Sequence, residues 1–128
     1  MKIKSSQNLV AEALSDIKTI SPEEGLKLAK NNECNLIDIR DEVELQKNGR
    51  IENSYHISRG LLEFSIHPES AYVQNKKIDL NKEIILFCAA GGRSALAAKT
   101  LKQMGFEKVS HIEGGFGLMK NSGFKVVK

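Results

Sequence analysis

Short apolar runs alternate along the chain with longer segments in which apolar residues recur every three or four positions. The runs have the length of β-strands, and the longer segments have the period of amphipathic helices. Strands are expected at residues 18–20, 36–39, 55–57, 83–87 and 109–112, and helices at residues 6–16, 22–30 and 94–104, with a short final helix after residues 113–116. This alternation predicts an α/β fold with a central, mainly parallel five-stranded sheet flanked by helices on both faces.

Local signals mark the ends of two of these helices. Ser21 can cap the second helix, Pro22 suits its first turn, and Glu24 completes a capping box. Gly105 is the expected end of the longest helix. A chain of 128 residues suits one domain with a substantial core. We therefore expect an N-terminal helical extension over residues 1–16 and a single α/β domain over residues 17–128.

Composition and charge exclude several function classes. The chain is 41% hydrophobic and 27% charged, with a net charge of +3 and lysines spread over its whole length, so no nucleic-acid partner is expected. The longest apolar run is too short to cross a membrane, and the N-terminus lacks the apolar centre of a secretory signal, which makes the cytoplasm the expected location. Two cysteines and three scattered histidines (His56, His67 and His111) show no zinc spacing, so neither a metal nor another cofactor is predicted.

The junction between the strand at residues 83–87 and the next helix carries the candidate chemistry. It consists of a cysteine, four small residues and two polar residues in the first helical turn: Cys88, Ala89, Ala90, Gly91, Gly92, Arg93 and Ser94. Small residues allow backbone N–H groups to converge on one point, and a helix N-terminus adds positive potential. Both effects favour a thiolate, as would the Arg93 guanidinium if it faced the sulfur. The pattern predicts that Cys88 is a reactive, accessible nucleophile.

Three separated segments, together with the end of the chain, resemble a known family. These segments are the acid-x-arginine sequence at residues 36–40 with Glu44 downstream, residues 49–57 with Arg50 in place of a customary histidine, and the loop from Cys88 to Arg93 followed by Ser94, which agrees in full. Residues 113–116 with Gly123 fit the closing segment, although Leu118 stands where a tryptophan is often found. Over residues 17–127 the chain thus resembles the rhodanese family of single-domain sulfurtransferases, which implies the three-layer rhodanese-like fold.

The resemblance implies a sulfur relay through a Cys88 persulfide. The donor would be a small sulfur anion such as thiosulfate or a persulfide, and the acceptor would be cyanide, a small thiol or a protein. The N–H groups from Ala89 to Ser94 would bind the transferring anion, as an oxyanion hole does. Arg93 would either contact the donor or pair with a nearby acid, and the Ser94 hydroxyl would either face the sulfur or cap the helix.

Three further residues are expected to support the site. Asp38 lies between Ile37 and Ile39 in a buried strand and must be paired, for which a salt bridge to Arg93 or a hydrogen bond to the loop backbone would serve. The resemblance implies a supporting role for Asp38 and Arg40. Arg59 belongs to a segment that in some relatives approaches the mouth of the site, and it is the candidate for recruiting an anionic donor.

Two other functions stay open from the sequence. A phosphatase or arsenate reductase of related fold also uses a cysteine loop that ends in arginine, but that loop has five intervening residues, whereas four lie between Cys88 and Arg93. A rhodanese-like module without catalysis, which binds or regulates a partner, is the other alternative, although such modules generally lack the cysteine. Cys34 is read as a structural residue, with a resolving thiol as its less favoured role.

Overall fold

A single parallel sheet forms the centre of the molecule. The computed structural model describes residues 1–75 and 77–128. The sheet contains β1 (Lys18–Ile20), β2 (Cys34–Asp38), β4 (Tyr55–His56), β5 (Glu83–Phe87) and β6 (Val109–Ile112) in the order β1-β6-β5-β2-β4. All four neighbouring pairs are parallel. The predicted five-stranded α/β architecture is confirmed.

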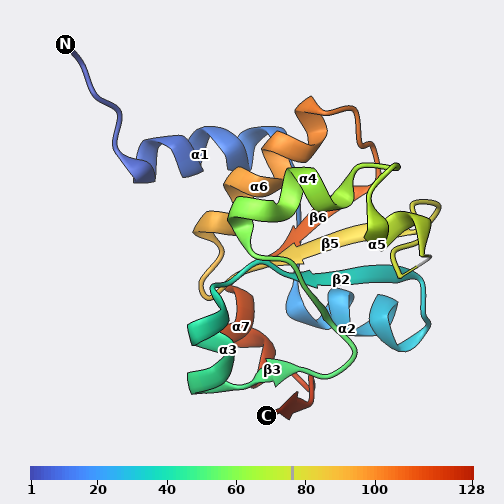
Figure 1. The fold of residues 1–128 in the computed structure, drawn as a ribbon. Coiled ribbons are helices and arrows are strands. Elements are labelled where there is room, and N and C mark those ends of the chain that lie inside the picture. The colour runs from blue at the N-terminus through green and yellow to red at the C-terminus, as the bar shows by residue number, and fades with distance from the viewer. Residues whose placement is uncertain (76) are drawn as a thin grey trace.

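Helices cover both faces of this sheet (Figure 1). On one side lie α1 (Ser6–Asp16), α4 (Leu62–Ile66), α5 (Ala71–Gln74) and α6 (Gly92–Gln103), and on the other lie α2 (Pro22–Lys30) and α7 (Gly115–Met119). The turn η1 (Arg59–Leu61) leads into α4, and α3 (Glu42–Asn48) follows β2 beside α7. Ser21 caps α2 by accepting the Glu24 N–H, as its sequence predicts.

The strand period divides the core into two layers, one on each face of the sheet. Ile37 and Leu86 pack with α4 and α6, whereas Leu36 and Ile85 pack with α2 and α7. Both faces of the central strands are therefore apolar, which is why their sequences read as continuous apolar runs. Buried parallel strands bring their carboxyl ends to one edge of the sheet, where the loops after β2, β5 and β6 meet.

A second, two-stranded sheet was not predicted. The strand β3 (Arg50–Ile51) pairs antiparallel with β7 (Val126–Val127) and ties the C-terminal tail to the domain. Gly49 precedes β3 with a φ of +87°, and a Cβ there would lie 2.8 Å from Val126 Cγ1 and 2.9 Å from Val127 O. The close approach explains why glycine occupies this turn.

The N-terminal helix α1 lies along α6 (Figure 1). Ser5 caps it by accepting the Asn8 N–H, and Ala13 is its buried residue. Asp16 at its end pairs with Lys99 of α6 at 3.6 Å. Among the described residues, no helix has the length and apolar character that a membrane crossing requires.

Candidate active site

The loop after β5 folds its backbone around the sulfur of Cys88. The Sγ atom accepts the Gly91 N–H at 3.1 Å and the Ser94 N–H at 3.3 Å. Gly91 has a φ of +108°, a conformation that favours glycine, and its position immediately before α6 starts that helix at Gly92, two residues earlier than predicted. The helix N-terminus and its N–H groups thus face a sulfur atom, an arrangement that favours negative charge there.

The start of α7 fixes the other side of the same loop. Phe116 N–H donates to Cys88 O at 2.8 Å, and Gly117 N–H donates to Ala89 O at 3.1 Å. Gly115 has a φ of +54°, and a Cβ there would lie 2.3 Å from Cys88 O. A trans peptide directs its N–H opposite to its C=O, so anchoring these carbonyls turns the N–H groups of Ala89 and Ala90 away from α7. Sequence reasoning missed this contact, although it placed residues 113–116 in the closing segment of the family pattern.

Cys88 is buried, contrary to the expectation of an accessible nucleophile. Its exposure is 1%, and its side chain belongs to the apolar cluster beneath α4 and α6. The reason is the tight closure of the loop, whose peptide groups and first helical turn surround the sulfur. Ala90 at the rim of the loop is exposed. Two of the loop N–H groups that the sequence analysis named, those of Gly91 and Ser94, nevertheless point at the sulfur.

Several N–H groups of the loop have no partner of their own. Within residues 1–75 and 77–128, the N–H groups of Ala89, Ala90, Gly92 and Arg93 make no hydrogen bond to the protein. Backbone donors at a helix start and in a small-residue loop are suited to bind an anion. The loop therefore holds two donors on the sulfur and four that remain available for a bound group.

Arg93 forms a two-pronged ion pair with Glu44 of α3. Its Nη1 and Nη2 atoms lie 2.7 Å and 3.0 Å from the two carboxylate oxygens. This contact lowers the pKa of Glu44 to about 2, and it raises the pKa of Arg93. Glu44 also closes the capping box of α3 with Asp41. Of the two arrangements open for Arg93, the structure has the pair with a nearby acid, so Arg93 fixes the helix start against α3.

Asp38 and Arg40 form a buried pair, which corrects the expected bond from Asp38 to Arg93 or to the cysteine loop. Arg40 Nη2 donates to Asp38 Oδ2 at 2.8 Å, and Arg40 Nε lies 3.1 Å from both oxygens. The guanidinium also donates to Gly49 O at 3.0 Å and lies 4.0 Å from the centre of the Phe116 ring. The fork of Arg40 is close enough in sequence to satisfy the carboxylate locally. The pair thus joins β2, the end of α3 and α7 beneath the loop.

Arg59 is engaged on the side of α6. Its Nη1 atom lies 2.8 Å from Glu63 Oε1, and its Nη2 atom donates to Thr100 Oγ1 at 3.4 Å. The Arg59 N–H donates to Ile39 O, which places the backbone of η1 at the end of β2. A donor-recruiting role for Arg59 would have to compete with Glu63 for the guanidinium.

A buried polar network adjoins the sulfur. Sequence reasoning gave the Ser94 hydroxyl facing the sulfur as one of two alternatives, which the structure has, but it missed the partners of Ser94 further along the network. Ser94 Oγ lies 3.5 Å from Cys88 Sγ, 3.2 Å from Gly91 O and 2.9 Å from His111 Nδ1. His111 Nε2 in turn lies 2.9 Å from Thr19 Oγ1. The sequence analysis found no zinc spacing for His111 and gave it no other role. The available signal was its strand position, since alternation places it on the same face as Val109, beneath α6.

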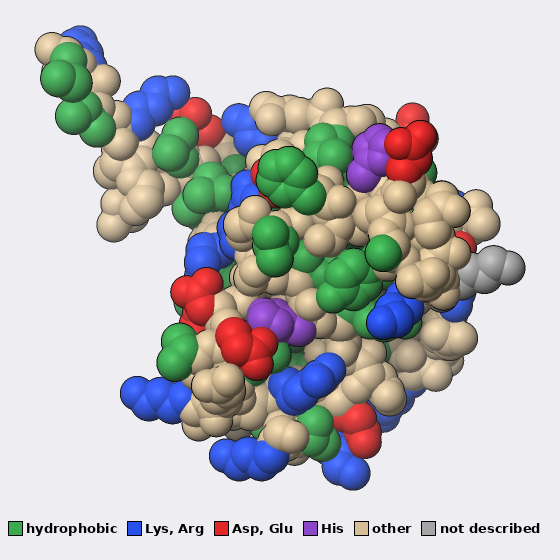
Figure 2. All heavy atoms as spheres, in the orientation of Figure 1, with side chains coloured by type: hydrophobic (Ala, Val, Ile, Leu, Met, Phe, Trp, Pro, Cys, Tyr) green, Lys and Arg blue, Asp and Glu red, His purple; other side chains and the backbone are tan. Residues whose placement is uncertain are grey.

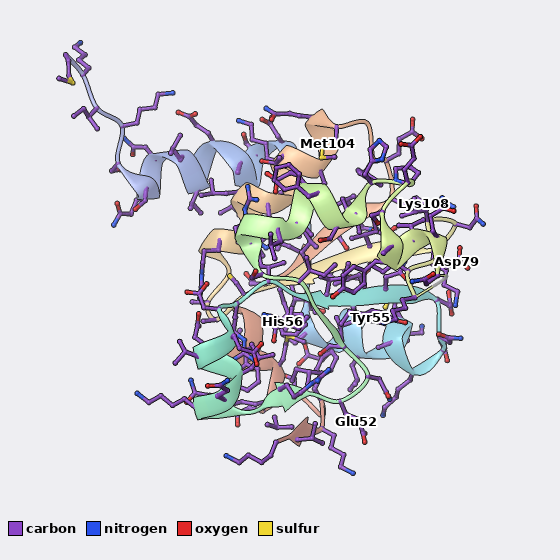
Figure 3. The ribbon with its side chains drawn as sticks, in the orientation of Figure 1. Glu52, Tyr55, His56, Asp79, Met104 and Lys108 are labelled. Carbon is purple, nitrogen blue, oxygen red and sulfur yellow. The ribbon has the colours of Figure 1, made fainter. Side chains whose placement is uncertain are left out.

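Cys34 lies at the opposite end of the sheet. It pairs in register with Glu83, five residues before Cys88, so about 16 Å separates the two cysteines along the strands, far beyond disulfide reach. Burial, with a smaller effect of Glu83, raises the pKa of the Cys34 thiol to about 11. Cys34 lines a cavity of about 820 Å³, together with Tyr55, Asp79 and Glu52, which Figure 3 labels. Cys88 does not line this cavity, so the cavity is separate from the cysteine loop.

The face that Figure 2 presents carries exposed hydrophobic side chains over α4. Leu61 and Phe64 are the exposed hydrophobic residues of η1 and α4, with exposures of 59% and 79%.

In the described part of the chain, no group of three or more His, Cys, Asp or Glu side chains is placed to hold a metal ion.

The fold and the cysteine loop define a rhodanese-like domain, and comparison with known proteins agrees. The family model for the rhodanese-like domain matches residues 21–121. The chain therefore belongs to the rhodanese-like family, whose named relatives include sulfurtransferases.

Individual relatives cover most of the chain. Thiosulfate sulfurtransferase GlpE of Pseudomonas putida is 30% identical over 107 residues, which are 84% of this chain and 88% of GlpE. The polysulfide-sulfur transferase homodimer of Wolinella succinogenes is 32% identical, with a TM-score of 0.73 over 94% of this chain and 85% of that one. A Rhodopseudomonas palustris protein of unknown function, described as a possible tyrosine phosphatase, is 37% identical, with a TM-score of 0.85 over 99% of this chain and 97% of that one.

Proposed function

We propose that this protein is a sulfurtransferase that moves a sulfane sulfur from thiosulfate or a persulfide donor to a thiol or cyanide, through a persulfide on Cys88. The observation that supports it best is the pair of N–H groups, from Gly91 and Ser94, directed at the Cys88 sulfur. Its sulfurtransferase relatives point to the same class of chemistry.

The first half-reaction loads the cysteine. The Cys88 thiolate attacks the outer sulfur of thiosulfate and forms a new S–S bond, while the bond to the sulfonate sulfur breaks and sulfite leaves with its electron pair. The unpartnered N–H groups of Ala89, Ala90, Gly92 and Arg93 are available to bind the donor's negative charge. Each preorganised donor of this kind typically stabilises a transition state by about 3 kcal/mol.

The second half-reaction transfers the outer sulfur from Cys88 to the acceptor. An acceptor thiolate or cyanide attacks the outer sulfur of the persulfide, and the Cys88 sulfur leaves as a thiolate with the electron pair of the broken bond. The N–H groups of Gly91 and Ser94 stabilise that leaving thiolate. Because Cys88 is 1% exposed, both steps require the rim of the loop to open to a small group.

The supporting residues keep the loop in this shape. Arg40 pairs with Asp38 at the end of β2 and lies over the Phe116 ring of α7, and Arg93 holds the start of α6 against Glu44. That Arg59 recruits anionic donors stays a prediction. For this role its guanidinium would have to leave Glu63.

A phosphatase is the second candidate, because the Rhodopseudomonas palustris relative is described as a possible tyrosine phosphatase. Two features of this chain disfavour it. Only four residues separate Cys88 from Arg93, which leaves a smaller ring of N–H groups than phosphate requires. The Arg93 guanidinium, which would have to bind phosphate, is engaged with Glu44.

Intact mass spectrometry tests the proposal. The reduced protein is incubated with thiosulfate or with glutathione persulfide, and one added sulfur is expected, lost again on addition of cyanide. Cys88→Ser should gain no sulfur, whereas Cys34→Ser should gain it fully. Absence of an adduct with both donors would refute the proposal and favour a binding module, and Cys88-dependent release of phosphate from an aryl phosphate would favour a phosphatase.

A further inference from the structure

A continuous series of hydrogen bonds connects the Cys88 sulfur to the surface of the molecule. It passes from Cys88 Sγ to Ser94 Oγ over 3.5 Å, to His111 Nδ1 over 2.9 Å, and from His111 Nε2 to Thr19 Oγ1 over 2.9 Å. The first three residues are buried, with exposures of 1%, 0% and 2%, whereas Thr19 lies exposed on the edge strand β1. A buried thiol has to release its proton before it can act as a nucleophile, and this series offers a route.

We propose that His111 is a positioning residue for Cys88: acting through Ser94, it carries the thiol proton toward Thr19 and leaves the Ser94 hydroxyl donating to the thiolate. The inference rests on the sulfur-transfer function proposed above and assigns to that site a proton route. It involves a change of tautomer and no net charge on the imidazole ring.

When Cys88 ionises, each proton moves by one group along the series. In the thiol state, Cys88 S–H donates to Ser94 Oγ, Ser94 O–H donates to His111 Nδ1, and His111 Nε2–H donates to Thr19 Oγ1. On ionisation the S–H proton moves to Ser94 Oγ, the original Ser94 proton moves to Nδ1, and the Nε2 proton passes through the Thr19 hydroxyl to solvent. Afterwards His111 Nδ1–H donates to Ser94, Ser94 O–H donates to the thiolate, and Nε2 accepts from Thr19. One proton has left, and no electrons have been transferred.

The surroundings of His111 suit a ring that stays neutral. Burial lowers the pKa of His111, so the imidazolium form is disfavoured inside the protein. The charged side chains of β1 and α6 are engaged with other partners. Lys18 pairs with Glu83, Lys99 with Asp16 and Arg93 with Glu44, and Lys102 donates to the Asp16 carbonyl. Glu113, which follows β6, is exposed. Neutral histidine can exchange one ring proton for another, and that exchange is what the route requires.

His111 also decides where the Ser94 hydroxyl donates. Gly91 O lies 3.2 Å from Ser94 Oγ and competes with the sulfur for its single proton. When Nδ1 carries a proton, it occupies a lone pair of Ser94 Oγ and removes Nδ1 as an acceptor, so the hydroxyl can turn to the charged sulfur. The thiolate then has three donors, namely the N–H groups of Gly91 and Ser94 and the Ser94 hydroxyl.

A titration of thiolate absorbance in the ultraviolet tests the route without any sulfur donor. It is performed in a Cys34→Ser background, with the Cys88→Ser double variant as the blank for tyrosine absorbance. His111→Phe, which fills the space without a hydrogen bond, should raise the pH midpoint of Cys88 ionisation by about one unit, the effect of one lost hydrogen bond to a charged group. His111→Asn, whose amide N–H can donate to Ser94, should recover part of this shift. His67→Asn, at an exposed histidine, should leave the midpoint unchanged.

Nitrogen NMR of the imidazole rings provides the second measurement. The His111 signal should change from the Nε2–H to the Nδ1–H tautomer over the same pH range in which Cys88 ionises. Thr19→Val, at an exposed position of β1, should weaken this change and raise the midpoint by less than His111→Phe does. The midpoints are compared only among variants whose urea unfolding shows a folded baseline.

Two results would overturn the relay: equal midpoints for the parent and His111→Phe, or equal shifts for His111→Phe and His111→Asn with no tautomer change. Either can occur while the parent protein still gains one sulfur from thiosulfate, in which case the proposed function stands alone. Conversely, a protein that gains no sulfur from either donor but shows the midpoint shift and the tautomer change would lose the proposed function and keep the proton route.

Discussion

Gly115 controls the approach of α7 to the cysteine loop, and Gly115→Ala tests how much the loop depends on it. The residue has a φ of +54°, and an added Cβ would lie 2.3 Å from Cys88 O and 2.9 Å from Ala89 C. Both atoms are backbone, so no side chain can rotate away. The loop or α7 would have to shift, which would strain the hydrogen bonds from Phe116 and Gly117 to the loop carbonyls.

The expected loss in the free energy of unfolding is about 4 kcal/mol, which combines left-handed backbone strain, overpacking and weakened hydrogen bonds. Gly105→Ala is the matched control, since Gly105 has a φ of +106° with no atom within 4 Å of the added Cβ. It carries backbone strain alone, about 1–2 kcal/mol. The φ of Gly115, +54°, lies nearer the left-handed minimum than the φ of Gly105, +106°. Backbone strain in Gly105→Ala is therefore at least as large as in Gly115→Ala, and any larger loss in Gly115→Ala comes from its contact with the loop.

Urea unfolding followed by circular dichroism measures both variants, and mass spectrometry measures their sulfur uptake from thiosulfate. Gly115→Ala should unfold at clearly lower urea than Gly105→Ala and should take up sulfur more slowly, whereas Gly105→Ala should take it up at the parent rate. If the two variants unfold at the same urea concentration and load sulfur equally, the contact between α7 and the loop does not control the site.

Three further predictions follow from the ion pairs and the second cysteine. Arg40→Met removes the ion-pair partner of the buried Asp38 carboxyl group and should lower the free energy of unfolding, measured in urea, by about 3–5 kcal/mol, a loss that adding Asp38→Asn should partly restore. Glu44 has a folded-state pKa of about 2, below its ordinary 4.5, so its pair with Arg93 stabilises the protein above about pH 4.5 and this contribution is lost as the pH falls toward 2. Glu44→Gln should therefore lose less stability than the parent between pH 5 and pH 2, by about 2 kcal/mol after allowance for partial solvent exposure, and parallel acid curves would contradict this. Cys34, whose pKa is raised to about 11, should react with iodoacetamide at pH 8 only slowly, and fast labelling there would show that its burial has been misjudged.

The elements of this domain follow from local sequence. The helix cap at Ser21 and the apolar runs of β2, β5 and β6 are short-range patterns, and the bounds of these elements in the structure agree with the predicted ones within a few residues. The small pair of β3 and β7 could not be predicted in this way, because each strand has two residues and depends on a partner far along the chain.

For the candidate site, too, one part could be predicted from local sequence and another part could not. The loop from Cys88 to Ser94 was recognisable because a strand, small residues and a helix start are contiguous, and a short loop has few ways to place its N–H groups. The partners of its charged residues were assigned less well. Asp38 was expected to bind either Arg93 or the loop backbone and instead binds Arg40, while Arg93 binds Glu44 on another helix. The buried Asp38 carboxylate had to be paired, but several arginines could meet that need.

The sequence by itself determined the α/β alternation and the cysteine loop, since each depends on residues close together in the chain, and it determined the family, since each of the separated motifs can be recognised within its own short segment. Only the tertiary structure decided what surrounds the sulfur: the burial of Cys88, the support from Gly115, and the series through Ser94 and His111 to Thr19. Those contacts join separate strands and helices. These contacts depend on how the layers pack, because a shift of a few tenths of an ångström between elements makes or breaks a hydrogen bond. No local sequence pattern encodes such shifts.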